Sequence, residues 1–210
     1  MILTFVQKER QPTPKFEGKI KDVVVITGKG SSHASNGYLE YKGDKVEIVS
    51  NPHREKMNGK AVTQVVDIVQ RSERVGYIYP DIVEQKRFLF LSFGYDYFVF
   101  NFKGKTYNAY EVGLGANEHY ICVYKDNSIV AIIKKEDKKT NFCDQYIVYA
   151  LGEENLLMLA LLTLYFDCIR YPDHGEIMYE SYRDDSFLTT QKELVDKYDA
   201  SFIDRVKAME

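Results

Sequence analysis

The stretch that decides the fold is Glu153–Tyr171, EENLLMLALLTLYFDCIRY. Between Leu156 and Phe166, only Thr163 carries a hydroxyl group without an aromatic ring. An amphipathic surface helix would show a polar residue at every third or fourth position. A helix that crosses a bilayer needs about 20 apolar residues, which is more than this run contains. The run therefore predicts a helix that is buried on all sides inside a folded domain.

Such a helix must be covered by the rest of the chain. Burying each large apolar side chain contributes roughly 1.5–3 kcal/mol. The whole run is thus worth more than the net stability of a typical domain, which is only about 5–15 kcal/mol. Gly152 precedes the predicted helix and Pro172 ends it. We expect the preceding residues to form a shell around it.

The residues before this helix read as ten to twelve short strands joined mostly by tight turns. The predicted strands are residues 2–8, 22–27, 38–41, 45–50, 61–70, 75–79, 87–93, 97–102, 106–112, 119–125, 128–135 and 145–151. Strands of this length span roughly 20–26 Å, and a helix of about 18 residues spans roughly 27 Å. A barrel of about eleven or twelve strands can hold a central helix. The predicted fold class is α+β, mainly β: a closed antiparallel barrel of about twelve strands around a buried hydrophobic helix, formed by residues 1–173.

Residues 174–210 form a predicted C-terminal helical appendage. Thr190 and Glu193 match the T-x-x-E capping box that often starts a helix. The amphipathic helix that follows places four residues on one stripe: Leu194, Tyr198, Phe202 and Val206. This stripe either docks a protein partner or a second copy of the chain, or it folds back on its own barrel.

Composition narrows the functional class. The net charge of −3 and the isoelectric point near 5.9 argue against a nucleic-acid-binding protein. The N-terminal residues MILTFVQKER do not have the pattern of a signal peptide. The chain has an odd number of cysteines, Cys122, Cys143 and Cys168, and none of them has C-x-x-C spacing. We therefore expect reduced thiols and a cytoplasmic protein.

Residues 119–173 also carry a family resemblance. They contain the strand IVAIIKK at 129–135, the residues DQY at 144–146, and then an acid-started apolar helix that ends near Asp167. This pattern resembles the end of the tubby C-terminal-like superfamily, which includes tubby, the LURP-one-related proteins, the phospholipid scramblases and many uncharacterised bacterial proteins. The resemblance implies a LURP-one-related or scramblase-like bacterial protein, folded as a closed barrel of about twelve strands around a hydrophobic C-terminal helix.

The chain departs from that family in ways that concern function. Members usually end with the central helix, whereas here residues 174–210 follow it. The phosphoinositide-binding basic residues of tubby cannot be placed on this sequence, and the cysteine-rich and proline-rich segments of scramblases are absent. The resemblance therefore implies a fold and does not imply a ligand.

The clearest candidate binding site is a group of basic residues, Lys134, Lys135, Lys138 and Lys139, interrupted by Glu136 and Asp137. Four such lysines can meet an anionic lipid headgroup at about 1 kcal/mol each near a membrane surface. The alternative is a solvated loop whose two acidic residues offset part of the positive charge.

Motifs for catalysis, cofactors and metals are not found. Residues 28–32, GKGSS, do not match the order of a phosphate-binding loop. His119 and Cys122 are three residues apart in a strand, which places them on opposite faces and argues against a shared metal or catalytic role. From the sequence we therefore predict no catalytic residue, no cofactor and no metal site.

The leading hypothesis is a non-enzymatic binding or scaffold module that recognises an anionic lipid or another phosphorylated ligand, and does not bind nucleic acid. The alternative is a protein-interaction or homo-oligomer-forming unit that acts through the C-terminal helix. A third hypothesis is an enzyme whose site is assembled from residues distant in the sequence.

Overall fold

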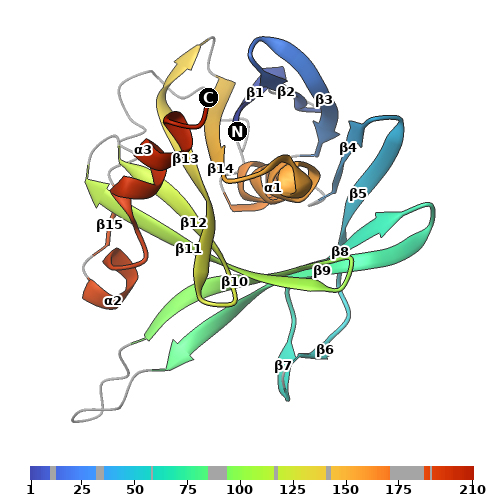
Figure 1. Cartoon of the computed structure of the whole chain (residues 1–210). Coiled ribbons are helices and arrows are strands. Elements are labelled where there is room, and N and C mark those ends of the chain that lie inside the picture. Colours follow the sequence, from blue (N-terminus) through green and yellow to red (C-terminus); the bar gives the residue numbers. More distant parts are fainter. Residues whose placement is uncertain are drawn as a thin grey trace.

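Twelve antiparallel strands close into a barrel in the computed structural model, which describes residues 1–9, 13–31, 36–57, 59–84, 94–115, 118–140, 143–170, 187–189 and 191–210 (Figure 1). The strands are β1 (Ile2–Glu9), β2 (Lys15–Ile20), β3 (Val23–Gly30), β4 (Gly37–Tyr41), β5 (Asp44–Asn51), β8 (Val65–Gln70), β9 (Glu73–Glu84), β10 (Gly94–Phe102), β11 (Lys105–Gly115), β12 (His119–Lys125), β13 (Ser128–Thr140) and β14 (Cys143–Ala150). Each strand pairs with its neighbours along the chain, and pairing of β1 with β14 closes the ring. The predicted fold class is confirmed.

Three short strands lie outside this ring. Between β5 and β8 the chain makes a separate hairpin of β6 (Glu55–Met57) and β7 (Lys60–Val62). The sequence predicts no strand at residues 51–60, and it places residues 61 and 62 in one strand with residues 65–70, which the structure divides into β7 and β8. The third, β15 (Phe187–Leu188), pairs with the end of β11. The sequence also did not predict β2, and the predicted strand at 87–93 lies outside the described residues.

The predicted apolar helix lies inside the barrel (Figure 1). It starts with a short 3₁₀ turn (η1, Glu153–Asn155), continues as α1 (Leu156–Tyr165) and ends in a π turn (η2, Phe166–Arg170). All residues of α1 except Leu157 are buried. The Thr163 hydroxyl donates a 2.8 Å hydrogen bond to the Leu159 carbonyl, so the single non-aromatic hydroxyl of α1 is satisfied within the helix. Tyr171, the last predicted helical residue, is outside the described part.

Two glycines in the barrel wall allow the helix to approach closely. A Cβ atom at Gly30 would fall on Cys168 Sγ, and one at Gly37 would lie 3.2 Å from Leu164 Cδ2. Gly30 lies in β3 and Gly37 lies in β4. Strand β3 includes residues 28–30, although the strand predicted from the sequence ends at residue 27. Glycine at these positions therefore serves packing, because any side chain there would collide with the helix.

The two ends of the barrel differ. At the end where the central helix starts, five hairpins turn over two residues each, and every non-glycine turn residue has a left-handed φ of 48–67°. These turns are Lys21–Asp22, Lys42–Gly43, Arg71–Ser72, Lys103–Gly104 and Asp126–Asn127. We call this the tight-turn end. The strands are joined by longer connections at the opposite end, the loop end, where the central helix finishes.

The C-terminal appendage covers the outer face of β11–β14 (Figure 1). It consists of two short helices, α2 (Lys192–Val195) and α3 (Ala200–Lys207), where the sequence had predicted one. The chain breaks between them because Asp199 caps α3, accepting a 3.0 Å hydrogen bond from the Ser201 amide. The predicted cap Thr190 lies outside the described residues.

The predicted stripe on this appendage packs on the chain's own barrel. Leu194, Phe202 and Val206 are buried there, and the Tyr198 ring lies 4.3 Å from that of Tyr120. The Lys197 amine lies 4.7 Å from the centre of the Tyr110 ring. Of the two alternatives for this stripe, the structure shows folding back. The other alternative, an exposed docking stripe, does not hold, because the stripe is buried against the apolar outer face of β11–β14.

Candidate functional site

Polar side chains gather inside the barrel at its loop end, an arrangement that the sequence analysis missed. We call this group the interior polar cluster; its members are Gln7, Glu111, His119, Lys135, Asp144, Tyr146 and Asp167. Each is at most 7% exposed. The signal for it was present in the sequence, because Glu111 shares the inward parity of Tyr107 and Ala109 in β11.

Strand register places these groups side by side. His119 is the cross-strand partner of Lys135, and Lys135 is the partner of Tyr146. Residues directly opposite each other point to the same face of a sheet, so one inward side chain makes the others inward as well. The cluster thus follows the barrel wall across β12, β13 and β14.

Contacts within the cluster pair its members. His119 Nε2 lies 3.1 Å from Glu111 Oε1, and Lys135 Nζ lies 3.9 Å from Asp144 Oδ1. The Tyr146 hydroxyl donates to Asp167 Oδ1 at 3.0 Å, which ties the wall to the end of the central helix. Buried charges are costly unless they are paired and hydrogen-bonded. The arrangement therefore resembles a structural network more than an open catalytic site.

The four lysines of the predicted binding site do not form one surface. Lys134 and Lys135 are neighbours in β13, and consecutive residues of a strand point to opposite faces. Lys135 consequently lies inside the barrel with Asp144, which makes its predicted role at a surface wrong. Lys134 lies on the outside, with Nζ 3.0 Å from Glu136 Oε1. Lys138 and Lys139 continue β13, and their side chains lie outside the described part.

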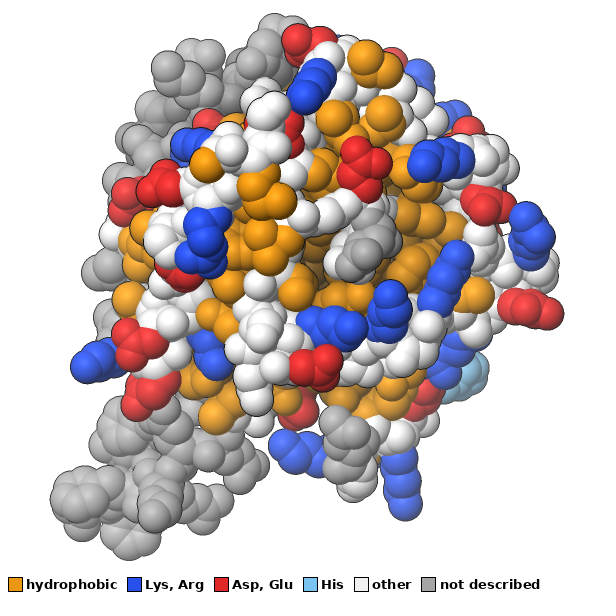
Figure 2. All heavy atoms as spheres, in the orientation of Figure 1, with side chains coloured by type: hydrophobic (Ala, Val, Ile, Leu, Met, Phe, Trp, Pro, Cys, Tyr) orange, Lys and Arg blue, Asp and Glu red, His pale blue; other side chains and the backbone are white. Residues whose placement is uncertain are grey.

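Basic residues do gather at the tight-turn end. The first position of four of the five turns is basic: Lys21, Lys42, Arg71 and Lys103. Acidic residues occupy two turn positions, at Asp22 and Asp126. We call the surface that these turns surround the tight-turn face. Viewed along α1, it shows apolar side chains at its centre and Lys and Arg side chains among Asp and Glu towards its rim (Figure 2).

Apolar side chains are also exposed at this end. Six large hydrophobic residues are exposed in the described part of the chain. Four of them lie at this end, Val23, Val24, Leu151 and Met209, whereas Val49 and Ile82 lie towards the loop end of β5 and β9. Val23 and Val24 follow the Lys21–Asp22 turn, and Leu151 and Met209 line a hollow of about 400 Å³ on the same face. Apolar side chains are expected to gather on a surface where something binds.

Neighbouring groups keep the charges of this face in place at neutral pH. A hydrogen bond with Tyr41, and more weakly the Glu153 carboxylate, raise the pKa of the Lys42 amine. The N-terminal amine donates to Glu210 and lowers the pKa of that carboxyl, and Lys21 acts in the same direction. The face therefore presents fixed charges of both signs around an apolar centre.

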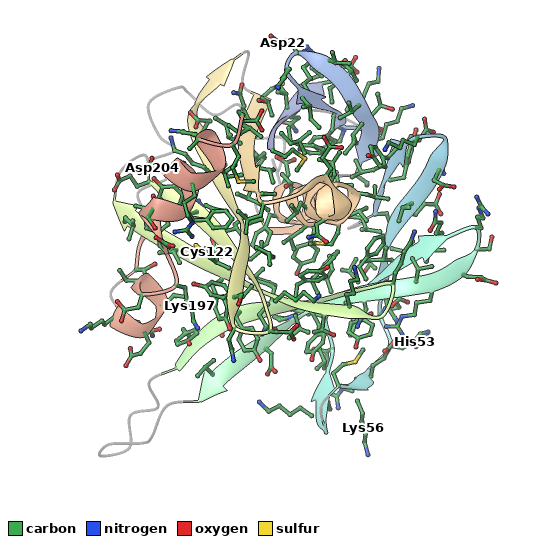
Figure 3. The ribbon with its side chains drawn as sticks, viewed as in Figure 1. Asp22, His53, Lys56, Cys122, Lys197 and Asp204 are labelled. Carbon is green, nitrogen blue, oxygen red and sulfur yellow. The ribbon has the colours of Figure 1, made fainter. Side chains whose placement is uncertain are left out.

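The outer side of the barrel is a weaker candidate for a functional site. Cys122 faces outward beneath the appendage (Figure 3), whereas His119 faces inward, so the predicted separation of these two residues is confirmed. Burial raises the pKa of the Cys122 thiol, which makes it a poor nucleophile. His53 and Lys56 lie by the β6–β7 hairpin, away from the barrel interior (Figure 3). Among the described residues, no group of three or more His, Cys, Asp or Glu side chains is placed to hold a metal ion.

Comparison of the chain with protein-family models, with curated proteins and with solved structures finds no match. Within the described ranges, no helix combines the length and the apolar character needed to cross a membrane.

Proposed function

We propose that the protein is a non-enzymatic binding module that docks on an anionic membrane surface through its tight-turn face. The observation that carries this proposal is the gathering of exposed apolar residues and basic turns at one end of the barrel. Binding to a membrane interface draws on both kinds of group, because apolar side chains enter the headgroup boundary while basic residues attract anionic lipids.

The magnitudes are consistent with reversible docking. Each basic residue near an anionic surface contributes about 1 kcal/mol. The acidic residues of the same face, Asp22, Asp126, Glu153 and Glu210, reduce the sum. Arg71 is also paired with Asp44 at 2.9 Å. Apolar burial adds about 25 cal/mol per Å² removed from water. Together these terms support weak and salt-sensitive binding, which is strengthened when several anionic lipids lie under the face at once.

An extended surface suits this face better than a single free phosphate. A helix start attracts anions, yet here Glu153 already occupies that place at the first turn of the central helix. The basic turns stand apart from one another around the rim, because they belong to different hairpins. Anionic groups spread over a plane can meet several of them, whereas one phosphate cannot.

Vesicle co-sedimentation tests the proposal. Vesicles of phosphatidylcholine are compared with vesicles that also contain phosphatidylglycerol, at low and at physiological salt. The wild type is expected to sediment with the anionic vesicles and to be released by salt. The double variant Lys42→Glu/Lys103→Glu should lose this binding. The matched control Lys29→Glu/Lys56→Glu changes two exposed lysines elsewhere by the same charge and should bind like the wild type.

Two results would overturn the proposal. One is a wild type that fails to sediment with anionic vesicles at low salt. The other is equal loss of binding in the tight-turn variant and in the control, which would show a general charge effect with no preferred face.

A further inference from the structure

The β2–β3 hairpin differs from the other four hairpins of the tight-turn face. In each of the five, the residue after the two-residue turn is the first residue of the next strand. Four of these residues are charged or polar: Asp44, Glu73, Lys105 and Ser128. In the β2–β3 hairpin the corresponding residue is Val23, which is 63% exposed, and the next residue, Val24, is 45% exposed. This hairpin therefore presents an apolar tip where the others present charged or polar ones.

The tip of the β2–β3 hairpin stands clear of the barrel. Consecutive residues of a strand point to opposite faces, so a strand in a barrel wall normally has one of each two neighbours buried. Val23 and Val24 are both exposed, and burial begins to alternate along β3 only from Ile26. The two valines thus extend beyond the part of the wall that packs around the central helix.

Two further apolar residues continue this tip across the face. Leu151 and Met209 are 46% and 63% exposed, and they line the hollow of about 400 Å³ together with Ile20. Val23 is the cross-strand partner of Ile20, and residues directly opposite each other share a face of the sheet. Val23 therefore lies on the side of the hollow. We call Val23, Val24, Leu151 and Met209 the apolar edge.

The charges beside the apolar edge do not add an attraction for anionic lipids. Glu210 is paired with both nearby cations, because its carboxylate lies 3.1 Å from the N-terminal amine and 3.8 Å from Lys21 Nζ. Asp22 lies at the outer tip of the hairpin (Figure 3), and Glu153 lines the hollow. Negative groups thus at least balance the positive ones here. The attraction for anionic lipids comes from the basic turns of the other hairpins.

We infer that the apolar edge enters the boundary between headgroups and acyl chains, and that the face therefore selects anionic membranes whose headgroups are loosely packed. Uncharged side chains gain from a membrane only where acyl chains can be reached between the headgroups, and such gaps are frequent in strongly curved bilayers. The basic turns supply the second requirement, a negative surface. This inference rests on the proposed function, because it names the kind of membrane that the face selects.

Vesicles of one composition and two sizes test the inference. Small sonicated and large extruded vesicles are made from the same mixture of phosphatidylcholine and phosphatidylglycerol, and binding per accessible lipid is measured by flotation at low salt. The wild type is expected to bind the small vesicles about tenfold more tightly. Val23→Ser/Val24→Ser should remove this preference and keep the salt-sensitive binding to large vesicles, because Lys42 and Lys103 are unchanged.

The chain offers a matched control for this variant. Val49→Ser/Ile82→Ser removes the two exposed large apolar side chains that lie towards the loop end, and it should bind both vesicle sizes like the wild type. Met209→Ser, which shortens the apolar edge by one residue, should lower the preference in part. All the substituted side chains are exposed, so the variants should fold, and their melting temperatures check this.

The outcomes separate this inference from the proposed function. Equal affinity of the wild type for small and large anionic vesicles would overturn the inference and leave docking on anionic membranes intact. A preference that survives in Val23→Ser/Val24→Ser, or that is lost equally in Val49→Ser/Ile82→Ser, would also overturn it. A wild type that binds anionic vesicles of neither size would overturn the proposed function itself.

Discussion

The hydroxyl of Tyr146, in the barrel wall, donates a 3.0 Å hydrogen bond to the carboxylate of Asp167, at the end of the central helix, and both side chains are buried. It joins the wall to the end of the central helix, as the Tyr107 hydroxyl joins the wall to the start by donating to Asn155 Oδ1 at 3.0 Å. Removing one donor from a buried carboxylate costs about 1–3 kcal/mol. We expect Tyr146→Phe to lower the free energy of unfolding by that amount in urea denaturation. Tyr38→Phe, on the partly exposed outer side of β4, should change it by less than about 0.5 kcal/mol.

Two leucines on either side of the helix start make a matched test of the central helix. Leu161 is fully buried inside the barrel and Leu151 is 46% exposed at its mouth. Leu161→Ala should lower the free energy of unfolding by about 2–5 kcal/mol, because it leaves a cavity in a packed core. Leu151→Ala should change it by about 0.5 kcal/mol or less. Similar losses in the two variants would contradict the burial of the helix.

Neighbouring lysines of β13 provide a second matched pair. Lys135 lies inside the barrel near Asp144, whereas Lys134 lies outside near Glu136. Removing one partner of a buried ion pair costs about 3–5 kcal/mol, while a partly exposed pair contributes about 0–1 kcal/mol. Lys135→Met should therefore lower the melting temperature much more than Lys134→Met. If both substitutions have the same small effect, the inward position of Lys135 is wrong.

The contact between the appendage and the barrel should lose stability at alkaline pH. Burial raises the pKa of Tyr124 to about 12, and its hydroxyl donates a 2.8 Å hydrogen bond to the Lys197 carbonyl. An unfolded tyrosine titrates near pH 10. A raised folded pKa contributes stability that is complete below about pH 10 and is lost as the pH rises towards 12. The free energy of unfolding should therefore fall more steeply above about pH 10 in the wild type than in Tyr124→Phe.

Comparing the wild type with Tyr124→Phe isolates the contribution of the Tyr124 hydroxyl. Burial also raises the pKa of Tyr95, Tyr97 and Tyr110, but these residues are present in both proteins. Parallel stability curves for the wild type and Tyr124→Phe would show that the Tyr124 hydroxyl is not held by the appendage. Far-UV circular dichroism at each pH would report whether α2 and α3 loosen before the barrel unfolds.

Several features of the candidate sites could be predicted from the sequence. The turns at Lys42–Gly43, Lys103–Gly104 and Asp126–Asn127 were predicted, and alternation along β13 already separates Lys134 from Lys135. What the sequence did not show is that these turns share one end of the barrel with Arg71–Ser72 and Lys21–Asp22. That depends on the complete strand order, and β2 was not predicted because Pro12 and Pro14 precede it.

The sequence by itself determined the barrel and its central helix. The eleven residues from Leu156 to Phe166 contain a single non-aromatic hydroxyl and must be buried away from water. Short strands joined by tight turns can form a barrel that encloses them. Only the tertiary structure decided where the polar and amphipathic groups go. Contacts such as Gln7 with the Asp144 amide or Lys21 with Glu210 join residues far apart in the chain. The stripe on the appendage shows the same limit, because an apolar face requires burial without specifying the surface that covers it.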